Sequence, residues 1–212
     1  METTVRFIGD VHAKWTRYSD LIKDCPRSLQ VGDFGVGFFT GEGRPITNSP
    51  NDLMSKGEHR FIRGNHDNPG FCRTHPFWVP DGEMCHDKIF CVGGADSIDK
   101  QWRTEGLDWW PDEELSYKEL CEVLEKYEAA KPAVVVSHEA PDSIVNKICA
   151  AGGFRKMDVS SSTRKMFDNM LDIHKPDLWI HGHWHVDHHT IQLGVEFIGL
   201  GELSFVDIDL SF

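Results

Sequence analysis

Short apolar runs recur along the chain, and most of them end at a glycine or serine followed by an acidic, amide or imidazole side chain. Runs rich in β-branched and aromatic residues predict strands, and the clearest is 133–137, which is apolar almost throughout. In chain order, the predicted strands before the tail are residues 5–8, 28–31, 59–62, 89–92, 133–137 and 177–180. Because polar residues follow these strands, the pattern indicates an α/β sheet with its function at the strand ends.

Between the strands lie stretches whose apolar residues recur every three or four positions, which is the spacing of an amphipathic helix. The predicted helices are residues 16–23, 111–130, 144–150 and 163–174. The second is expected to begin at Pro111, because proline and the acids that follow it favour a helix N-terminus. The tail alternates apolar and polar positions and predicts a β meander of residues 190–193, 195–198 and 205–210.

The connection from residue 34 to residue 50 is longer than two neighbouring elements need. It is rich in glycine and carries Phe38 and Phe39. Two interpretations fit this loop equally well: it faces a substrate, or it is a surface excursion whose aromatic side chains pack into the core.

Composition limits the class of protein. A chain of 212 residues with 40% hydrophobic and 26% charged residues is expected to form a single domain over 1–212 with a substantial core. Its net charge of −12 argues against a long nucleic acid as partner, because a broad surface that binds nucleic acid needs clustered lysine and arginine. It does not exclude a phosphorylated substrate, because bound metal ions reverse the local field.

Apolar stretches and cysteine spacing predict the cellular location of the protein. No stretch approaches the roughly 18 apolar residues of a membrane span, and the N-terminus has no apolar signal segment. The six cysteines show no C-x-x-C spacing. We therefore expect a cytoplasmic protein with free thiols and no membrane partner.

Potential metal ligands follow five of the predicted strands. They are Asp10 and His12, Asp33, Asn65 and His66, His138, and His183 and His185. Taken singly, each has a simpler interpretation as a turn residue or a hydrogen-bonded core histidine. Their joint occurrence at strand ends predicts a metal site, because carboxylate, amide oxygen and imidazole are ligands of divalent Mn, Fe and Zn. No cysteine accompanies them, which weighs against structural zinc.

The stretch Gly182-His183-Trp184-His185 carries two of these histidines. In an extended segment, residues two apart point to the same side, so His183 and His185 are expected to face one target and Trp184 to point away and pack. Gly182 would let the backbone approach that target closely. His181 is expected to be a packed strand histidine rather than a partner of a metal ligand, and His188 and His189 to be structural or solvent-facing.

Taken in order, the motifs resemble those of the calcineurin-like metallophosphoesterase superfamily. They are Gly9-Asp10-Val11-His12, Gly32-Asp33-Phe34-Gly35, Gly64-Asn65-His66-Asp67, Ser137-His138 and Gly182-His183-Trp184-His185. The resemblance implies a four-layer αββα sandwich, in which two mixed β-sheets are flanked by helices. It also implies a dinuclear metal centre at the strand ends.

The resemblance assigns the metal ligands. One ion would be held by Asp10, His12 and His185, and the other by Asn65, His138 and His183. Asp33 would bridge both, since a shared carboxylate offsets the repulsion between two cations. We expect two divalent ions, with Mn²⁺ first and Fe, Zn, Ni or Mg as alternatives.

The resemblance also implies the chemistry. A hydroxide that bridges the metals would attack phosphorus, its pKa having been lowered by the ions. His66 matches the catalytic histidine of the family, and Asp67 is expected to orient it and raise its basicity. A protonated His66 would stabilise developing charge or protonate the leaving oxygen.

The motifs depart from those of phosphoprotein phosphatases in the same superfamily. Those enzymes carry Gly-Asp-x-Val-Asp-Arg-Gly, whereas this chain has Gly-Asp-Phe-Gly-Val-Gly from residue 32 and lacks the arginine that grips phosphate. Arg103 is the predicted substitute, because arginine suits bidentate phosphate binding. The alternative is a surface arginine paired with an acid.

The predicted activity is therefore a metal-dependent phosphomonoesterase acting on a small molecule or a phosphoprotein. One alternative is a phosphodiesterase acting on nucleotides or cyclic nucleotides, or a nuclease, with the same metals. Another is a binding module without catalysis, and retention of every ligand together with His66 and Asp67 counts against it. The sequence predicts no oligomeric state.

Overall fold

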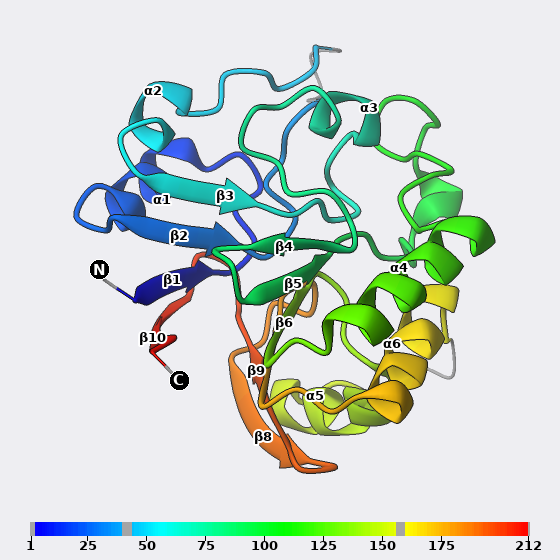
Figure 1. Cartoon of the computed structure of the whole chain (residues 1–212). Coiled ribbons are helices and arrows are strands. Elements are labelled where there is room, and N and C mark those ends of the chain that lie inside the picture. The colour runs from blue at the N-terminus through cyan, green and yellow to red at the C-terminus, as the bar shows by residue number, and fades with distance from the viewer. Residues whose placement is uncertain (1–2, 40–43, 156–159, 212) are drawn as a thin grey trace.

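The structure is a computed structural model that describes residues 3–39, 44–155 and 160–211. Two β-sheets lie face to face, with helices α1 to α3 beside one sheet and α4 to α6 beside the other (Figure 1). This confirms the predicted fold of two mixed sheets flanked by helices. In the described part of the chain, no helix has both the length and the apolar character needed to cross a membrane.

The first sheet has the strand order β10-β1-β2-β3. Its strands are β1 (Thr4–Ile8), β2 (Arg27–Gln30), β3 (Glu58–Phe61) and β10 (Phe205–Asp209). The first three are parallel, and β10 runs antiparallel to β1. The helices of this half are α1 (Trp15–Ile22), α2 (Asn51–Met54) and α3 (Pro69–Cys72).

The second sheet has the order β4-β5-β6-β7-β9-β8. Its strands are β4 (Glu83–Cys85), β5 (Ile89–Val92), β6 (Val134–Ser137), β7 (Leu178–His181), β8 (His188–Gln192) and β9 (Val195–Gly199). The four central strands are parallel, and β4 and β8 are antiparallel edge strands. The helices of this half are α4 (Tyr117–Ala130), α5 (Val145–Gly152) and α6 (Ser162–Ile173), with short 3₁₀ turns η1 (Lys100–Trp102) and η2 (Asp142–Ile144).

Three apolar clusters hold the four layers together. The cluster between the sheets joins Phe7 and Leu29 of the first sheet to Val136 and Ile180 of the second. Another lies between the first sheet and α1, and the third lies between the second sheet and α4 to α6. Strands β5, β6 and β7 at the centre of the second sheet are buried at every position, because both faces of this sheet are covered there.

The prediction that a helix begins at Pro111 is wrong. Helix α4 begins at Tyr117, where Ser116 and Glu119 form a reciprocal capping box. Glu113 and Glu114, which led to the prediction of an earlier start, form hydrogen bonds with other segments instead. Glu113 accepts hydrogen bonds from Ser97, and Glu114 accepts one from the backbone of Thr163 at the start of α6.

The predicted meander of the tail is only partly right. Strands β8 and β9 form a hairpin, but β9 pairs with β7 in parallel, and β10 crosses to the other sheet to pair with β1. Alternation of apolar and polar residues identifies a strand without identifying its partner. Strand β4 and helices α2 and α3 were not predicted, because three or four residues are too few to show a periodic pattern.

Candidate metal centre

The polar residues predicted from the strand ends meet at one edge of the sandwich. Asp10 follows β1, Asp33 follows β2 and Asn65 follows β3 in the first sheet, while His138 and His183 follow β6 and β7 in the second. These five strands point their carboxyl ends to this edge, which is why side chains distant in sequence are neighbours here.

The backbone at this edge is unusual. His12, Asp33, His183 and His185 all have positive φ, between 47° and 66°, a conformation that side-chain-bearing residues rarely adopt. The two histidines after β7 therefore lie on a tight loop and not on an extended segment, so the predicted reason for their common direction is wrong. Strained positions of this kind concentrate at functional sites.

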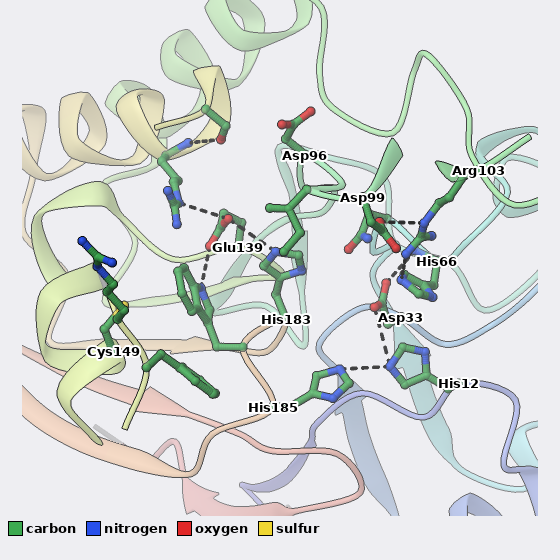
Figure 2. A pocket seen from close by; sticks show the side chains of 17 residues that line it. His12, Asp33, His66, Asp96, Asp99, Arg103, Glu139, Cys149, His183 and His185 are labelled. Atoms are coloured by element: carbon green, nitrogen blue, oxygen red, sulfur yellow. Dashed lines mark hydrogen bonds and ion pairs between the residues drawn. The ribbon is translucent and has the colours of Figure 1, made fainter. Parts of the chain in front are cut away.

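A first cluster consists of Asp10, His12, Asp33 and His185, each of which offers a ligand atom within 4.8 Å of the others. The Nε2 atoms of His12 and His185 are 3.1 Å apart, and Asp10 Oδ2 lies 3.0 Å from His185 Nε2. Figure 2 shows the two imidazoles directed at each other beneath Asp33. Together they bring the donor atoms of four side chains to one point.

Asp10 provides a test of whether a cation fits this cluster. Its Oδ1 accepts a hydrogen bond from the backbone of His183, but its buried Oδ2 lacks an aligned hydrogen-bond donor. A buried carboxylate oxygen without an aligned donor is costly, and a divalent ion beside it would remove that cost. The donor set therefore fits a metal ion.

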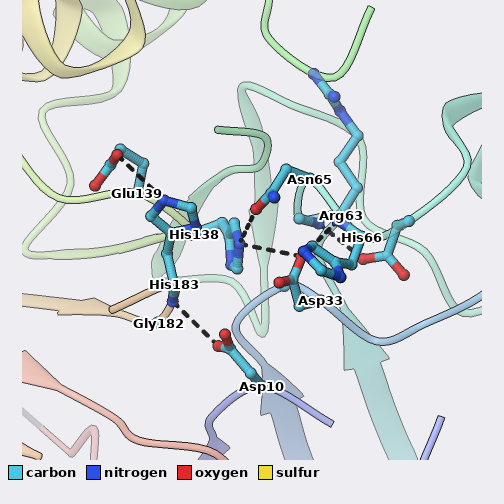
Figure 3. A network of polar contacts seen from close by, with 12 residues as sticks. Asp10, Asp33, Arg63, Asn65, His66, His138, Glu139, Gly182 and His183 are labelled. Atoms are coloured by element: carbon cyan, nitrogen blue, oxygen red, sulfur yellow. Dashed lines mark hydrogen bonds and ion pairs between the residues drawn. The ribbon is translucent and has the colours of Figure 1, made fainter. Parts of the chain in front are cut away.

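A second cluster consists of Asp33, His138 and His183, again with ligand atoms within 4.8 Å of one another. His138 Nε2 lies 3.2 Å from both Asp33 Oδ1 and Asn65 Oδ1 (Figure 3). Asp33 is the residue common to the two clusters, since its Oδ2 lies 3.7 Å from His12 Nε2. The structure thus brings together all seven residues that the resemblance named as ligands, in two groups that share Asp33.

Neighbouring groups hold the second cluster in a ligating orientation. His138 Nδ1 donates to the carbonyl of Val31 at 2.9 Å, which directs Nε2 toward the site. Asn65 Nδ2 donates to Ser97 Oγ at 3.0 Å, so the amide oxygen points at His138. Ser97 in turn donates to the buried carboxylate of Glu113.

The charges at the site favour a cation. Burial alone would raise the pKa of Asp33, but the imidazoles of His138, His66 and His12 hold it well below its ordinary value. Burial likewise opposes a charge on His138, yet Asp33 and Asp10 raise the pKa of its imidazole to about 10. A proton on His138 therefore compensates the buried carboxylates, and a bound divalent ion would displace it.

His66 lies beside the two clusters and contacts Arg103. Arg103 Nη2 is 2.8 Å from His66 Nε2, and the ring stacks on Phe38 at 5.0 Å between centroids. Guanidinium is always a donor, so Nε2 is the acceptor and the proton of His66 is on Nδ1. Burial lowers the pKa of His66 to about 4, with Arg103 adding to the effect against the attraction of Asp33. His66 is thus neutral here.

Phe38 also bears on the question about the loop from 34 to 50. Phe38 stacks on His66 and also contacts the buried Trp110 at 5.9 Å between centroids, so both interpretations of the loop remain open. Residues 40–43 of the loop lie outside the described residues.

Asp67 does not have the predicted contact with His66. Its carboxylate accepts hydrogen bonds from the backbone amides of Phe34, Gly35, Val36 and Gly64, at 2.6 to 3.0 Å. Burial and the charge of Asp33 raise its pKa to about 6. Asp67 therefore ties the loop after β2 to the loop after β3, and so positions Asp33 relative to Asn65.

Glu139 was not identified from the sequence, although it directly follows His138. It is buried, and its Oε2 lies 3.6 Å from His183 Nε2 and 3.2 Å from Arg164 Nε. Its Oε1 accepts a hydrogen bond from Trp184 Nε1 at 2.7 Å. Glu139 thus lies behind His183, as a carboxylate often does behind a metal-binding histidine.

Replacing Glu139 with Gln is expected to lower metal affinity about 10- to 100-fold, the usual effect of losing a partner of a metal-binding histidine. The neutral amide keeps the size of the side chain but removes the charge that faces His183. Calorimetric titration with Mn²⁺ measures the change. Glu196→Gln is the matched control, because Glu196 contacts His189 at 2.8 Å on the exposed hairpin; equal affinities for the two variants would contradict the prediction.

The remaining histidines of the stretch lie outside the two clusters. His181 is fully buried in β7, and its Nε2 is 2.9 Å from His188 Nε2. Burial lowers the pKa of His181 to about 3, so the pair is held by one neutral imidazole donating to the other. Trp184, which was expected to point away, borders the cleft at the site.

A cleft of about 470 Å³ opens over the two clusters. Its polar side is lined by His12, Asp33, Asn65, His66, His183 and His185. Arg103 also lines it and is held by Asp99, whose carboxylate lies 2.7 Å from Nε. Figure 2 shows Arg103 and His66 at one end of the cleft and Cys149 at the other, with Glu139 and His183 between them.

Comparison with known proteins gives the following relationships. The model of the family described as calcineurin-like phosphoesterase matches residues 3–187. A search of curated proteins found no match. Among solved structures, the phosphopantetheinyl hydrolase PptH from Mycobacterium tuberculosis has a TM-score of 0.56 and 13% identity, covering 100% of this chain and 97% of that one.

A second similar structure is that of GAP50, the anchor in the inner membrane complex of Plasmodium. It has a TM-score of 0.50 and 12% identity, with coverage of 94% of this chain and 72% of that one. At these identities the two structures support the fold alone.

Proposed function

The chain belongs to the calcineurin-like phosphoesterase family, and we propose that it is a phosphomonoesterase that acts on small molecules or phosphoproteins with two Mn²⁺ ions. Membership of the family makes it a metal-dependent hydrolase of phosphoesters. The preference for monoesters and for Mn²⁺ is our proposal. The proposed phosphoesterase activity is supported above all by one observation, that Asp33 joins two ligand clusters directly beside His66 and Arg103.

When bound, two divalent ions supply positive charge for the phosphoryl oxygens and lower the pKa of the attacking water. In hydrolysis, the oxygen of water bonds to phosphorus, the ester P–O bond breaks, and the leaving oxygen takes up a proton. Arg103 lines the cleft with its Nη2 beside His66 and would bind a phosphoryl oxygen. That contact would draw Arg103 from His66 Nε2 and leave its lone pair free to accept the proton that the attacking water gives up and to pass it to the leaving oxygen.

The proposed partner is a phosphorylated substrate and not a long nucleic acid, in keeping with the net charge of −12. A cytoplasmic location also remains our proposal. It is supported by the cysteines, since Cys25, Cys72, Cys85, Cys91, Cys121 and Cys149 are all free thiols.

A substrate panel tests the proposed activity. It comprises p-nitrophenyl phosphate, bis-p-nitrophenyl phosphate, nucleotides and a phosphopeptide, each with Mn²⁺, Ni²⁺, Mg²⁺ and Zn²⁺. We expect the fastest turnover with the monoester and Mn²⁺. Activity on the diester without activity on the monoester would overturn the proposed preference.

A diesterase is the second candidate function, and the size of the cleft favours it. A volume of about 470 Å³ leaves room beside the phosphoryl group for a second organic substituent. The same panel separates the two candidates, because the two p-nitrophenyl esters share one leaving group.

Replacing Arg103 with Ala is expected to raise KM for the preferred monoester about 10- to 100-fold, because a hydrogen bond to a charged group contributes about 1.5–3 kcal/mol. Steady-state kinetics at saturating Mn²⁺ measure the change. Arg73→Ala is the control, since Arg73 forms an exposed ion pair with Asp112 away from the cleft. An unchanged KM in the Arg103 variant would show that Arg103 does not bind phosphate.

A further inference from the structure

The end of the cleft opposite His66 and Arg103 is apolar. Cys149 of α5 lies at this end (Figure 2), and Phe154 beyond α5, Trp184 after β7 and Ile98 from the loop after β5 continue the apolar lining of the cleft. Ile98 is 63% exposed and Phe154 51% exposed, although both are large apolar side chains. Apolar residues exposed together at the rim of a concave surface are typical of a ligand-binding groove.

Trp184 is held in a fixed position in this wall. Its Nε1 donates to Glu139 Oε1 at 2.7 Å, and the guanidinium of Arg164 lies 4.9 Å from the ring centroid. Glu139 and Arg164 are 3% and 4% exposed, so both supports are part of the protein interior. A ligand that contacts the indole therefore meets a surface that does not have to be ordered on binding.

Few polar groups in this part of the cleft are available to a ligand. Apart from the metal ligands and His66, Asp96, Asp99 and Arg103, the polar residues that line the cleft are Glu139, Arg155, Ser161 and Arg164, and Glu139 and Arg164 contact each other at 3.2 Å. A polyhydroxylated group placed here would lose water without gaining matching hydrogen bonds, which is costly. An aromatic or other apolar ring would lose little and would gain contact with Phe154 and Trp184.

We propose that the apolar lining of the cleft, formed by Ile98, Cys149, Phe154 and Trp184, binds the organic part of the substrate, and that this part is an apolar, ring-bearing group. The inference rests on the proposed phosphoesterase function and names its substrate class. The cleft holds the phosphoryl group between the metal ligands and Arg103, and its volume of about 470 Å³ leaves the apolar lining for the alcohol or phenol of the ester.

Direct binding of three phosphonates to the Mn²⁺-loaded protein tests the proposal without turnover. Methylphosphonate reports the phosphoryl site alone, 2,3-dihydroxypropylphosphonate adds a polar group, and benzylphosphonate adds a ring. Calorimetry is expected to show benzylphosphonate binding at least about tenfold more tightly than the other two, because burial of the ring removes apolar area from water. Equal affinities of the three ligands would overturn the proposal.

Two variants locate the effect. Ile98→Ala and Phe154→Ala are each expected to reduce the preference for benzylphosphonate at least about threefold while methylphosphonate binds as before. Ile191→Ala and Phe205→Ala are matched controls, with side chains that are 67% and 48% exposed on β8 and β10. An unchanged preference in both cleft variants would place the ring elsewhere and overturn the proposal.

The same measurements separate this inference from the function on which it rests. If methylphosphonate binds and p-nitrophenyl phosphate is hydrolysed, but no preference for the ring exists, the inference fails and the phosphatase activity stands. If no phosphonate binds and no phosphoester is hydrolysed with any of the four metals, both fail.

Discussion

Replacement of Asp33 by Asn is expected to reduce phosphoester hydrolysis by more than about a thousandfold, since removal of even one donor that stabilises transition-state charge costs a hundred- to a thousandfold. Asp33 contributes an oxygen to both ligand clusters. Its Oδ1 also accepts the backbone N–H of His66 at 2.7 Å, so the amide oxygen of Asn is expected to take that position. The amide nitrogen would then face His12, where it offers protons in place of a lone pair.

The loss of metal measures the effect directly. Elemental analysis after dialysis is expected to show about two Mn²⁺ per wild-type chain and at most one in the Asp33→Asn variant. Asp24→Asn is the control, because Asp24 is exposed in the turn after α1. A variant that keeps two ions and full activity would rule out Asp33 as the bridging ligand.

The convergence of the ligands could be predicted because it follows from topology. Asp10, Asp33, Asn65 and His138 each come directly after an apolar strand, and parallel strands bring such positions to one edge. The resemblance to the metallophosphoesterase motifs implied which ligand belongs to which group. The structure places the residues accordingly, with Asp33 in both groups.

The support for the ligands could not be predicted, because it comes from segments distant in sequence. Glu113 is 48 positions from Asn65, yet it orients Asn65 through Ser97. In the sequence its acidic neighbourhood looked like a helix start, and only the packing of the loop after β5 shows its function.

Asp67 shows how proximity in sequence can mislead. It adjoins His66, but its carboxylate points to four backbone amides on two loops. A carboxylate among amides that lack other partners is stabilised more by them than by one imidazole. Its function is therefore to hold two loops together, and a substitution there would act on the whole site rather than on proton transfer.

Replacement of His138 by Ala is expected to abolish activity and to reduce the bound Mn²⁺ from about two ions to about one, because His138 belongs to only one of the two clusters. Removal of the imidazole also leaves a cavity in the protein interior. The imidazole is fully buried in a slot formed by Gly32 and Gly64, where an added Cβ would lie 2.3 Å from Nδ1 and 2.7 Å from Nε2 of His138, respectively. A cavity of this kind lowers stability by a few kcal/mol.

Free imidazole separates the loss of a ligand from the loss of stability. The cavity in the variant has the shape of an imidazole and retains the carbonyl of Val31 as a hydrogen-bond acceptor, so added imidazole is expected to restore the second ion and part of the activity. His59→Ala is the matched control, since His59 is also buried and hydrogen-bonded, at 2.9 Å to Ser28, but lies on β3 outside the clusters. That variant is expected to melt at a lower temperature while keeping both ions. If His138→Ala also kept both ions, the second cluster would not be a metal site.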